Sequence, residues 1–217
     1  MSPVPIVGAL VGPELTRTPR GVALLEALVA RGVRTEEASA HDFASAADTD
    51  APQGILVAAE VPGWTLDALP AGGNIVVLDA VQDPGNVGTI LRTAAALGAA
   101  GTVALPGTVD LWNAKVIRSA VGAQFRHPAV TASWEAFQSF LTERGLPLWA
   151  TTLEGTPLAR VECTTPVALA VGNEGAGLSR TTLDHAARRV SIPITDGAES
   201  LNVAVATGIV LYHLRRS

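Results

Sequence analysis

The sequence predicts an α/β protein in which a small α/β domain, residues 1–70, precedes a larger domain with a mostly parallel sheet, residues 74–217. The chain has 217 residues, of which 48% are hydrophobic, and this is enough to build a full core. After residue 74, short apolar runs alternate with segments of helical spacing, which indicates βαβ units. A stretch rich in proline and glycine, 61–74, marks a linker between the two parts.

The first domain contains few regular segments. Val4–Thr18 contains prolines and shows no clear period, so we interpret it as an irregular lead segment. Apolar residues at helical spacing predict a helix over Gly21–Arg31, which Gly32 would end. The other expected elements are a short strand at Glu36–Ala38, a short helix at His41–Ala47 and a buried strand at Gln53–Glu60.

The second domain begins with Asn74–Asp79, a continuous apolar run that is typical of a parallel strand buried on both faces. Further strands are expected at Gly101–Leu105, Pro147–Thr152, Val167–Val171 and Val190–Ile192. Helices are expected at Asn86–Leu97, Leu111–Gln124, Ser133–Arg144 and Leu178–Arg188, with a last one from Leu201.

Polar loops with glycines follow three of these strands and precede helices. They are DPGNVG at Asp83–Gly88, GNEGAG at Gly172–Gly177 and DGAESLN at Asp196–Asn202. Ligands of open parallel sheets bind at the carboxyl ends of the strands, so the loops predict one site for a small polar ligand. The chain has neither a GxGxxG dinucleotide fingerprint nor a phosphate loop ending in GK[ST], which argues against an oxidoreductase and a P-loop enzyme.

Charge and cysteine content exclude several classes of protein. A formal net charge of -5 argues against a nonspecific nucleic-acid coat, which needs massed Lys and Arg, but it allows a local basic site. Cys163 is the only cysteine, so an intrachain disulfide is excluded, and we expect a buried apolar thiol. Four scattered histidines predict no metal site. Because every apolar run is shorter than about 18 residues and no signal segment is visible, we expect a cytoplasmic protein without a membrane span.

The segments that carry the polar loops resemble a known family. Leu78–Ala99, Leu169–Ser179 and Val190–Leu214 are similar, in this order, to the three motifs of the SpoU, or TrmH-type, RNA ribose 2′-O-methyltransferases of the SPOUT class. Lys115–Pro128 resembles the basic stretch that the family carries between its first two motifs. The first domain is similar to the family's small L30e-like substrate-binding domain, chiefly through the strand at Gln53–Ala59.

The resemblance implies a methyl transfer from S-adenosyl-L-methionine (SAM) to a ribose 2′-hydroxyl of a structured RNA. Ribosomal RNA is the expected substrate. A transfer RNA substrate, a resistance-type methyltransferase and a catalytically silent RNA-binding or ribosome-assembly protein of the same fold remain open alternatives. The family also implies a homodimer and a C-terminal trefoil knot, a rare exception to unknotted topology. Because the sulfonium of SAM already activates the methyl group, no metal is expected.

The motifs of the family assign roles to residues of this chain. The expected cofactor-binding residues are Thr151, Gly172, Ile192 and Leu201. The expected catalytic residues are Asn86, Arg92, Glu174, Ser200 and Asn202, and the expected RNA-binding residues are Arg118 and Ser119.

Some of these roles have alternatives. The arginine side chain stays protonated at neutral pH and is a poor base, so we expect Arg92 to bind the adjacent phosphate and stabilise the developing alkoxide. Glu174 is expected to orient Arg92 or Asn86, and Asn86 fits a helix N-cap equally well. Outside the motif context, Ile192 would be an ordinary core residue.

Overall fold

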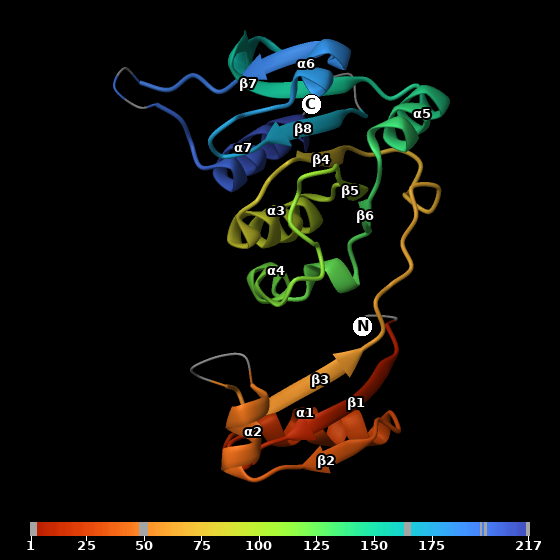
Figure 1. The fold of residues 1–217 in the computed structure, drawn as a ribbon, viewed down its shortest axis with the longest axis vertical. Coiled ribbons are helices and arrows are strands. Elements are labelled where there is room, and N and C mark those ends of the chain that lie inside the picture. The colour runs from red at the N-terminus through yellow and green to blue at the C-terminus, as the bar shows by residue number, and fades with distance from the viewer. Residues whose placement is uncertain (1–3, 48–51, 163–165, 196, 198, 216–217) are drawn as a thin grey trace. The chain divides into compact units, whose positions relative to one another are not determined.

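The computed structural model describes residues 4–47, 52–162, 166–195, 197 and 199–215 (Figure 1). The chain divides into two compact units, Met1–Pro62 and Gly63–Ser217, which are described separately. Trp64 and Leu69 pack on a core of the second unit, which is why the first unit ends before the expected boundary at residue 70. The predicted buried thiol of Cys163 and the loop residue Asp196 lie outside the described residues.

The first unit is built on a three-stranded sheet in the order β2-β1-β3. The central strand is β1 (Ile6–Val11), which pairs parallel with β2 (Thr35–Glu37) and antiparallel with β3 (Ile55–Ala59). The interpretation of Val4–Thr18 as an irregular lead segment is therefore wrong, because its prolines flank β1 without interrupting it. β3 was expected to be buried, but it is an edge strand and Val57 is 48% exposed.

Two helices accompany this sheet, and both begin at a side-chain cap. They are α1 (Pro19–Ala30) and α2 (Ala40–Ala46), with a single 3-10 turn, η1 (Leu15–Arg17), before α1. The hydroxyls of Thr18 and Ser39 accept hydrogen bonds from backbone N–H groups in the first turns of α1 and α2. These helices lie within a few residues of the predicted bounds.

The second unit contains a six-stranded sheet in the order β6-β5-β4-β8-β7-β9, and every neighbouring pair is parallel. The strands are β4 (Ile75–Asp79), β5 (Gly101–Ala104), β6 (Ala129–Thr131), β7 (Leu148–Pro157), β8 (Ala168–Gly172) and β9 (Arg188–Ser191). The predicted α/β fold with a mostly parallel sheet is confirmed. β6 was not predicted because three residues are too few to show a period.

The helices of the second unit are α3 (Pro84–Leu97), α4 (Ala114–Ala120), α5 (Trp134–Arg144), α6 (Arg180–His185) and α7 (Val203–Arg215), with 3-10 turns η2 (Ala123–Phe125) and η3 (Leu158–Arg160). The helix expected over Leu111–Gln124 is divided, because Val121 and Gly122 adopt left-handed backbone angles. α6 is shorter than expected, since Arg188 already belongs to β9. In the described part of the chain, no helix has the length and apolar character needed to cross a membrane.

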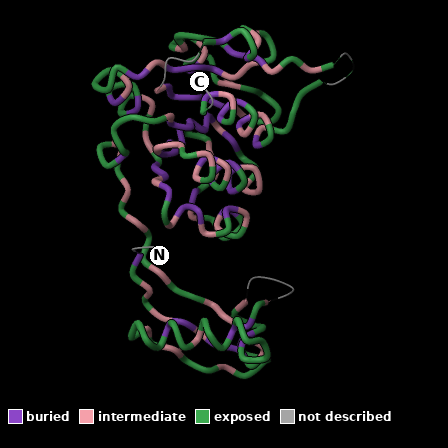
Figure 2. The backbone as a smooth tube through the Cα atoms, turned by 180° about the vertical axis from the view of Figure 1, so that it is seen from behind, coloured by how far each residue is buried: buried purple, intermediate pink, exposed green. Residues whose placement is uncertain are grey.

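Both faces of the central strands are buried, as Figure 2 shows by the concentration of buried residues in this unit. On β4, Val76 and Leu78 belong to a core shared with α3, α4 and α7, whereas Ile75 and Val77 belong to a core shared with α5. This alternation follows from the period of two along a strand. The central strands therefore hold their carboxyl ends between two packed layers.

The register of the sheet brings the polar loops to one edge. Asp79 at the end of β4 pairs with Gly172 at the end of β8, and β9 joins the same sheet through β7. Because these strands are parallel, the loops after β4, β8 and β9 all leave the sheet at its carboxyl edge. Asp79 is 4% exposed, and its carboxylate accepts a hydrogen bond from the Ser179 backbone N–H at 2.7 Å, which ties the second loop to β4.

Candidate functional site

A chain of hydrogen bonds joins the three polar loops. The Asn86 side-chain Nδ2 donates to Glu174 Oε1 at 2.9 Å, and the Asn202 Nδ2 donates to Asn86 Oδ1 at 2.9 Å. Asn202 Oδ1 in turn accepts from the backbone N–H groups of Ala204 and Val205, at the start of α7. One residue from each predicted motif therefore takes part in a single polar network, which positions the ends of α3 and α7 against the second loop.

Asn86 is free to join this network because another residue caps α3. Asp83 is the N-cap, its carboxylate accepts from the Asn86 backbone N–H at 2.7 Å, and Pro84 occupies the first turn. The alternative that Asn86 is itself the N-cap is therefore wrong. Its side chain points to the other loops and not back to its own helix.

Glu174 is held in its charged form. Partial burial alone would raise the pKa of Glu174. Hydrogen bonds outweigh this effect and lower the pKa below its ordinary value; they come from the Asn86 side chain and from backbone N–H groups, including those of Gln82 and Asp83 at 3.4 Å. Glu174 therefore carries a negative charge at neutral pH. Of its two expected partners it contacts Asn86; no contact with Arg92 is found among the described residues.

The second loop is a tight hairpin that leaves no room for a side chain at its first residue. Backbone hydrogen bonds run between Asn173 and Gly177 in both directions, at 2.9 and 3.0 Å. A Cβ on Gly172 would lie 2.4 Å from the carbonyl carbon and oxygen of Gly177 and 2.5 Å from the Leu178 nitrogen. Gly172 therefore allows the backbone to approach closely at the point where β8 ends.

A cavity of about 800 Å³ lies at this edge of the sheet, a size typical of small-molecule sites. Its walls come from the ends of β7 and β8, the second loop and the segment between β9 and α7. All four expected cofactor-binding residues line it, together with three of the expected catalytic residues: Thr151, Gly172, Ile192, Leu201, Glu174, Ser200 and Asn202. Asn86 reaches the same site through its bonds to Glu174 and Asn202.

The chemistry of the cavity is that of a site for a cation with an apolar part. Its charged lining residues are Glu174 and Glu199, and none of the described residues that line it is basic. Ile192 and Leu201 offer apolar surface, with Leu201 37% exposed. The Thr151 hydroxyl is buried and has no hydrogen-bond partner in the described structure, so it has an unused bond to offer a ligand.

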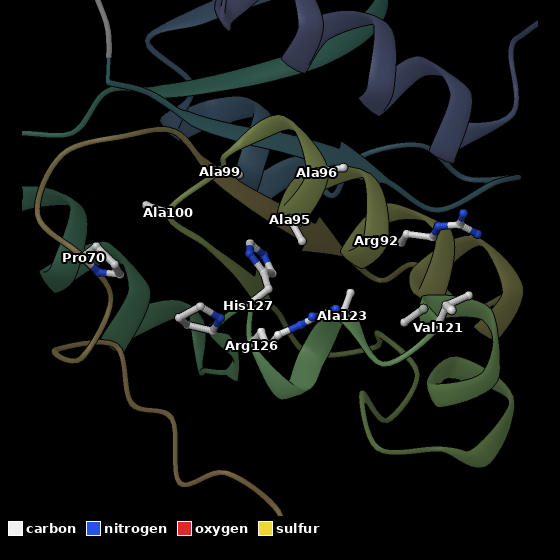
Figure 3. A pocket seen from close by; sticks show the side chains of 12 residues that line it. Pro70, Arg92, Ala95, Ala96, Ala99, Ala100, Val121, Ala123, Arg126 and His127 are labelled. Carbon is white, nitrogen blue, oxygen red and sulfur yellow. The ribbon is translucent and has the colours of Figure 1, made fainter. Parts of the chain in front are cut away.

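The structure does not bring Arg92 to this cavity within one subunit. Arg92 follows Asn86 by six residues, which on a helix corresponds to a rotation of about 240°, and it points to a different side of α3. It lines a second cavity of about 610 Å³ between α3 and the segment after α4 (Figure 3). The position of Arg92 is thus the main departure from the predicted single site.

The basic stretch after the first motif contributes to this second cavity more than the sequence suggested. Of the two expected RNA-binding residues, Arg118 is exposed on α4, whereas Ser119 packs against α3, where a Cβ on Gly88 would lie 2.5 Å from the Ser119 Cβ. Arg126 and His127 line the second cavity and were not singled out. The signal that could have found them is the sequence RHP at the end of Lys115–Pro128.

His127 is neutral under ordinary conditions. Its side chain is buried, and a ring nitrogen lies 2.9 Å from the Thr102 hydroxyl. Burial disfavours the charged imidazolium and lowers the pKa of His127 from 6.5 to about 4. The charge of the second cavity therefore comes from Arg92 and Arg126.

These features define a class of protein, a parallel-sheet α/β protein with a ligand cavity at the carboxyl edge of the sheet, beside three polar loops that hydrogen bonds join. Residues 73–212 match the SpoU rRNA Methylase family, and the chain therefore belongs to this family. The predicted resemblance is confirmed.

Curated relatives and solved structures agree with this membership. The chain is 37% identical over 185 residues to the 23S rRNA (guanosine(2553)-2′-O)-methyltransferase RlmP of Bacillus subtilis, covering 85% of this chain and 73% of the relative. It is similar to the AdoMet-bound rRNA methyltransferase of Sinorhizobium meliloti, with a TM-score of 0.85, 32% identity and coverage of 99% and 81%. The SpoU methyltransferase AviRb of Streptomyces viridochromogenes in complex with AdoMet gives a TM-score of 0.87, 28% identity and coverage of 99% and 84%.

Proposed function

We propose that the protein transfers the methyl group of SAM to a ribose 2′-hydroxyl of ribosomal RNA. The observation that carries this proposal is the meeting of the three motif loops at the carboxyl edge of the sheet. The second and third loops line one cavity, and the first loop joins them through the network of Asn86, Glu174 and Asn202. RlmP and the Sinorhizobium meliloti protein are named as rRNA methyltransferases, and the two solved structures described above hold AdoMet. Both facts support the same reaction.

The residues of the cavity fit SAM. When bound, SAM supplies a methyl group on a positively charged sulfonium, which needs no further activation. Glu174 and Glu199 give the cavity a negative potential that favours such a cation. Ile192 and Leu201 offer apolar contacts to an adenine ring, and Thr151 offers its unused hydroxyl.

The chain's own residues would position the ribose. Asn86, held on both sides by Glu174 and Asn202, has a fixed orientation, and Ser200 lines the cavity beside Asn202. A preorganised polar group costs little reorganisation when charge develops on the 2′-oxygen. Arg92 would bind the adjacent phosphate and stabilise the alkoxide. Because its guanidinium lines the second cavity, this role requires the RNA or a partner subunit to bridge the two.

The two units would divide the work. We assign the second unit, which holds residues 74–217, to the methyltransferase domain. We assign the first unit, which lies within residues 1–70, to an L30e-like domain that binds the RNA, with Arg118 as a further phosphate contact. The reaction selects RNA, because DNA lacks the 2′-hydroxyl. A transfer RNA substrate is the alternative, and ribosomal RNA is favoured by the names of the relatives. Such a substrate is consistent with a cytoplasmic protein.

A homodimer and a C-terminal trefoil knot complete the proposal. α7 carries an exposed apolar stripe at helical spacing, with Val205 52%, Ile209 39% and Tyr212 53% exposed. A second copy of this chain would cover the stripe. Pairing of α7 and its neighbour α3 with the same helices of the partner would bring Arg92 close to the partner's site.

The trefoil knot would come from the segment between β9 and α7 passing through the loop of a neighbouring element.

Methyl transfer from tritiated SAM to unmodified 23S rRNA, 16S rRNA and bulk tRNA tests the proposal. We expect label in ribosomal RNA, and label in tRNA alone would favour the alternative substrate. Arg92→Ala should bind SAM as the wild type does, measured by calorimetry, and should lose transfer. Arg180→Ala, which removes an exposed arginine paired with Asp184, is the matched control. Transfer by Arg92→Ala at the wild-type rate would show that the role assigned to Arg92 is wrong.

A further inference from the structure

The second cavity has the opposite charge from the first. No acidic residue lines it, and its rim carries Arg92 and Arg126, neither of which makes an ion pair within the described residues. Both guanidiniums are exposed at the rim, so their charge is available to a ligand (Figure 3). On a chain with a formal net charge of -5, such a cavity is a local site for an anion.

The walls between the two arginines are largely apolar. Ala95 and Ala96 follow Arg92 on α3 and Ala99 lies just after the helix, and their short side chains leave a hollow of about 610 Å³. The buried His127 imidazole forms part of the opposite wall. A hollow with apolar walls and a cationic rim matches a nucleotide, whose base is planar and whose phosphate is negative.

A strained residue also faces this cavity. Val121 ends α4 with φ 51° and ψ 41°, a left-handed conformation that is unfavourable for a β-branched residue, and its side chain is 65% exposed. Gly or Asn would adopt these angles at lower cost. Strain of this kind is concentrated at functional sites, and here it places an apolar side chain on the wall of the hollow.

The position along α3 relates the hollow to the proposed reaction. Asn86 takes part in the polar network, and Arg92 lies six residues further on, about 9 Å along the helix axis. α3 therefore connects the hollow with the polar network.

We propose that the cavity between α3 and the segment after α4 binds a nucleotide of the substrate RNA near the methylated residue. Its base lies against the alanines of α3 and Val121, and its phosphate binds Arg126. This inference rests on the proposed function, and it makes the cavity a determinant of which RNA sequence is accepted.

Three substitutions test the cavity by different physical effects. Arg126→Ala removes a charge, Ala96→Leu fills the hollow from an exposed helix position that accepts leucine, and Val121→Asn removes the apolar wall while relieving strain. Arg160→Ala is the matched control, because Arg160 is an exposed arginine in η3 outside both cavities. The measured quantities are the Kd for an unmodified 23S rRNA transcript at several salt concentrations, the Kd for SAM and the rate of methyl transfer.

We expect Arg126→Ala to weaken RNA binding roughly tenfold and to reduce the slope of log K against log salt by about 0.7–0.9, as the loss of one phosphate contact requires. Ala96→Leu and Val121→Asn should weaken RNA binding with the slope unchanged, and Val121→Asn should unfold at the same or a higher urea concentration. Arg160→Ala should match the wild type, and SAM binding should be unchanged in all four variants.

Two further outcomes separate this proposal from the proposed function. If the wild type methylates rRNA but Arg126→Ala, Ala96→Leu and Val121→Asn bind the transcript as Arg160→Ala does, the cavity does not hold a nucleotide and the proposed function stands. If the wild type binds the transcript through the cavity but transfers no methyl group, the proposed function is overturned while the cavity is supported. A wild type that binds no RNA overturns both.

Discussion

Replacing Gly172 by alanine gives a sharp test of how the second loop shapes the ligand cavity. An added Cβ would lie 2.4 Å from the Gly177 carbonyl carbon and oxygen and 2.5 Å from the Leu178 nitrogen, whereas ordinary contacts begin at 3.4 Å. The hairpin therefore has to move by about 1 Å. Gly172 has no positive φ, so the clash, and not the backbone conformation, decides the effect.

The size of the effect follows from this geometry. A glycine to alanine change at a compatible position stabilises a protein by about 0.4–1 kcal/mol, but overpacking costs about 1–3 kcal/mol. We therefore expect net destabilisation by about 1–2 kcal/mol. Movement of the hairpin also displaces Glu174 from Asn86 and reshapes the cavity, and the Kd for SAM should rise at least tenfold, or about 1.4 kcal/mol.

Gly175→Ala in the same loop is the matched control. Its Cβ would meet only the Asn173 side-chain oxygen, at 3.7 Å, and Gly175 also lacks a positive φ. Urea unfolding and calorimetric titration with SAM should give values for Gly175→Ala close to those of the wild type. If Gly172→Ala binds SAM as tightly as Gly175→Ala, close packing at the end of β8 does not shape the cofactor site.

Three further predictions concern single hydrogen bonds and one proton. Thr151→Val should weaken SAM binding by about 1 kcal/mol, or roughly fivefold, without lowering stability, because the lost hydroxyl has no partner in the described structure. Thr142→Val in α5 is the control and should leave the SAM affinity unchanged. A Thr151→Val variant that is destabilised but binds SAM with wild-type affinity would contradict the assignment. The pKa of His127 is about 4 in the folded protein, so on acidification the unfolded chain binds a proton at this residue before the folded protein does. The free energy of unfolding should therefore be at its full value above pH 6.5 and should fall by about 2–4 kcal/mol as the pH is lowered to about 4. His127→Gln should reduce this loss of stability in urea unfolding. An unchanged dependence on pH would show that the pKa of His127 is the same in the folded and unfolded protein. A double-mutant cycle on Asn86→Ala and Asn202→Ala should give a coupling free energy of about 0.5–1 kcal/mol, and a value of zero would mean that their hydrogen bond does not join the loops.

The sequence was sufficient to predict five of the six strands of the second unit's sheet and its polar loops. A continuous apolar run such as Asn74–Asp79 has few alternatives to a buried parallel strand, and β4 is buried along its whole length. The three motif loops were predicted to share a site, and the structure brings them together. Short or edge elements were harder: β1 was missed between prolines, and β6 has too few residues to show a period.

The hydrogen-bond partners within the site could not be predicted from sequence. Whether Asn86 caps its own helix or crosses to another loop depends on Asp83, three residues earlier, which takes the cap position. The direction of Arg92 depends on its rotation around α3 and on packing against α4, which loop motifs do not encode. Arg126 was not singled out because its relation to Arg92 exists only after α3 and η2 pack together.

A crystal structure of the protein with SAM would test the central claim most directly. We expect the adenosyl group beside Gly172, Ile192 and Leu201, with the methyl group facing the network of Asn86, Glu174 and Asn202. SAM bound in the arginine-lined cavity, or in the expected cavity with its methyl group turned away from this network, would contradict the claim.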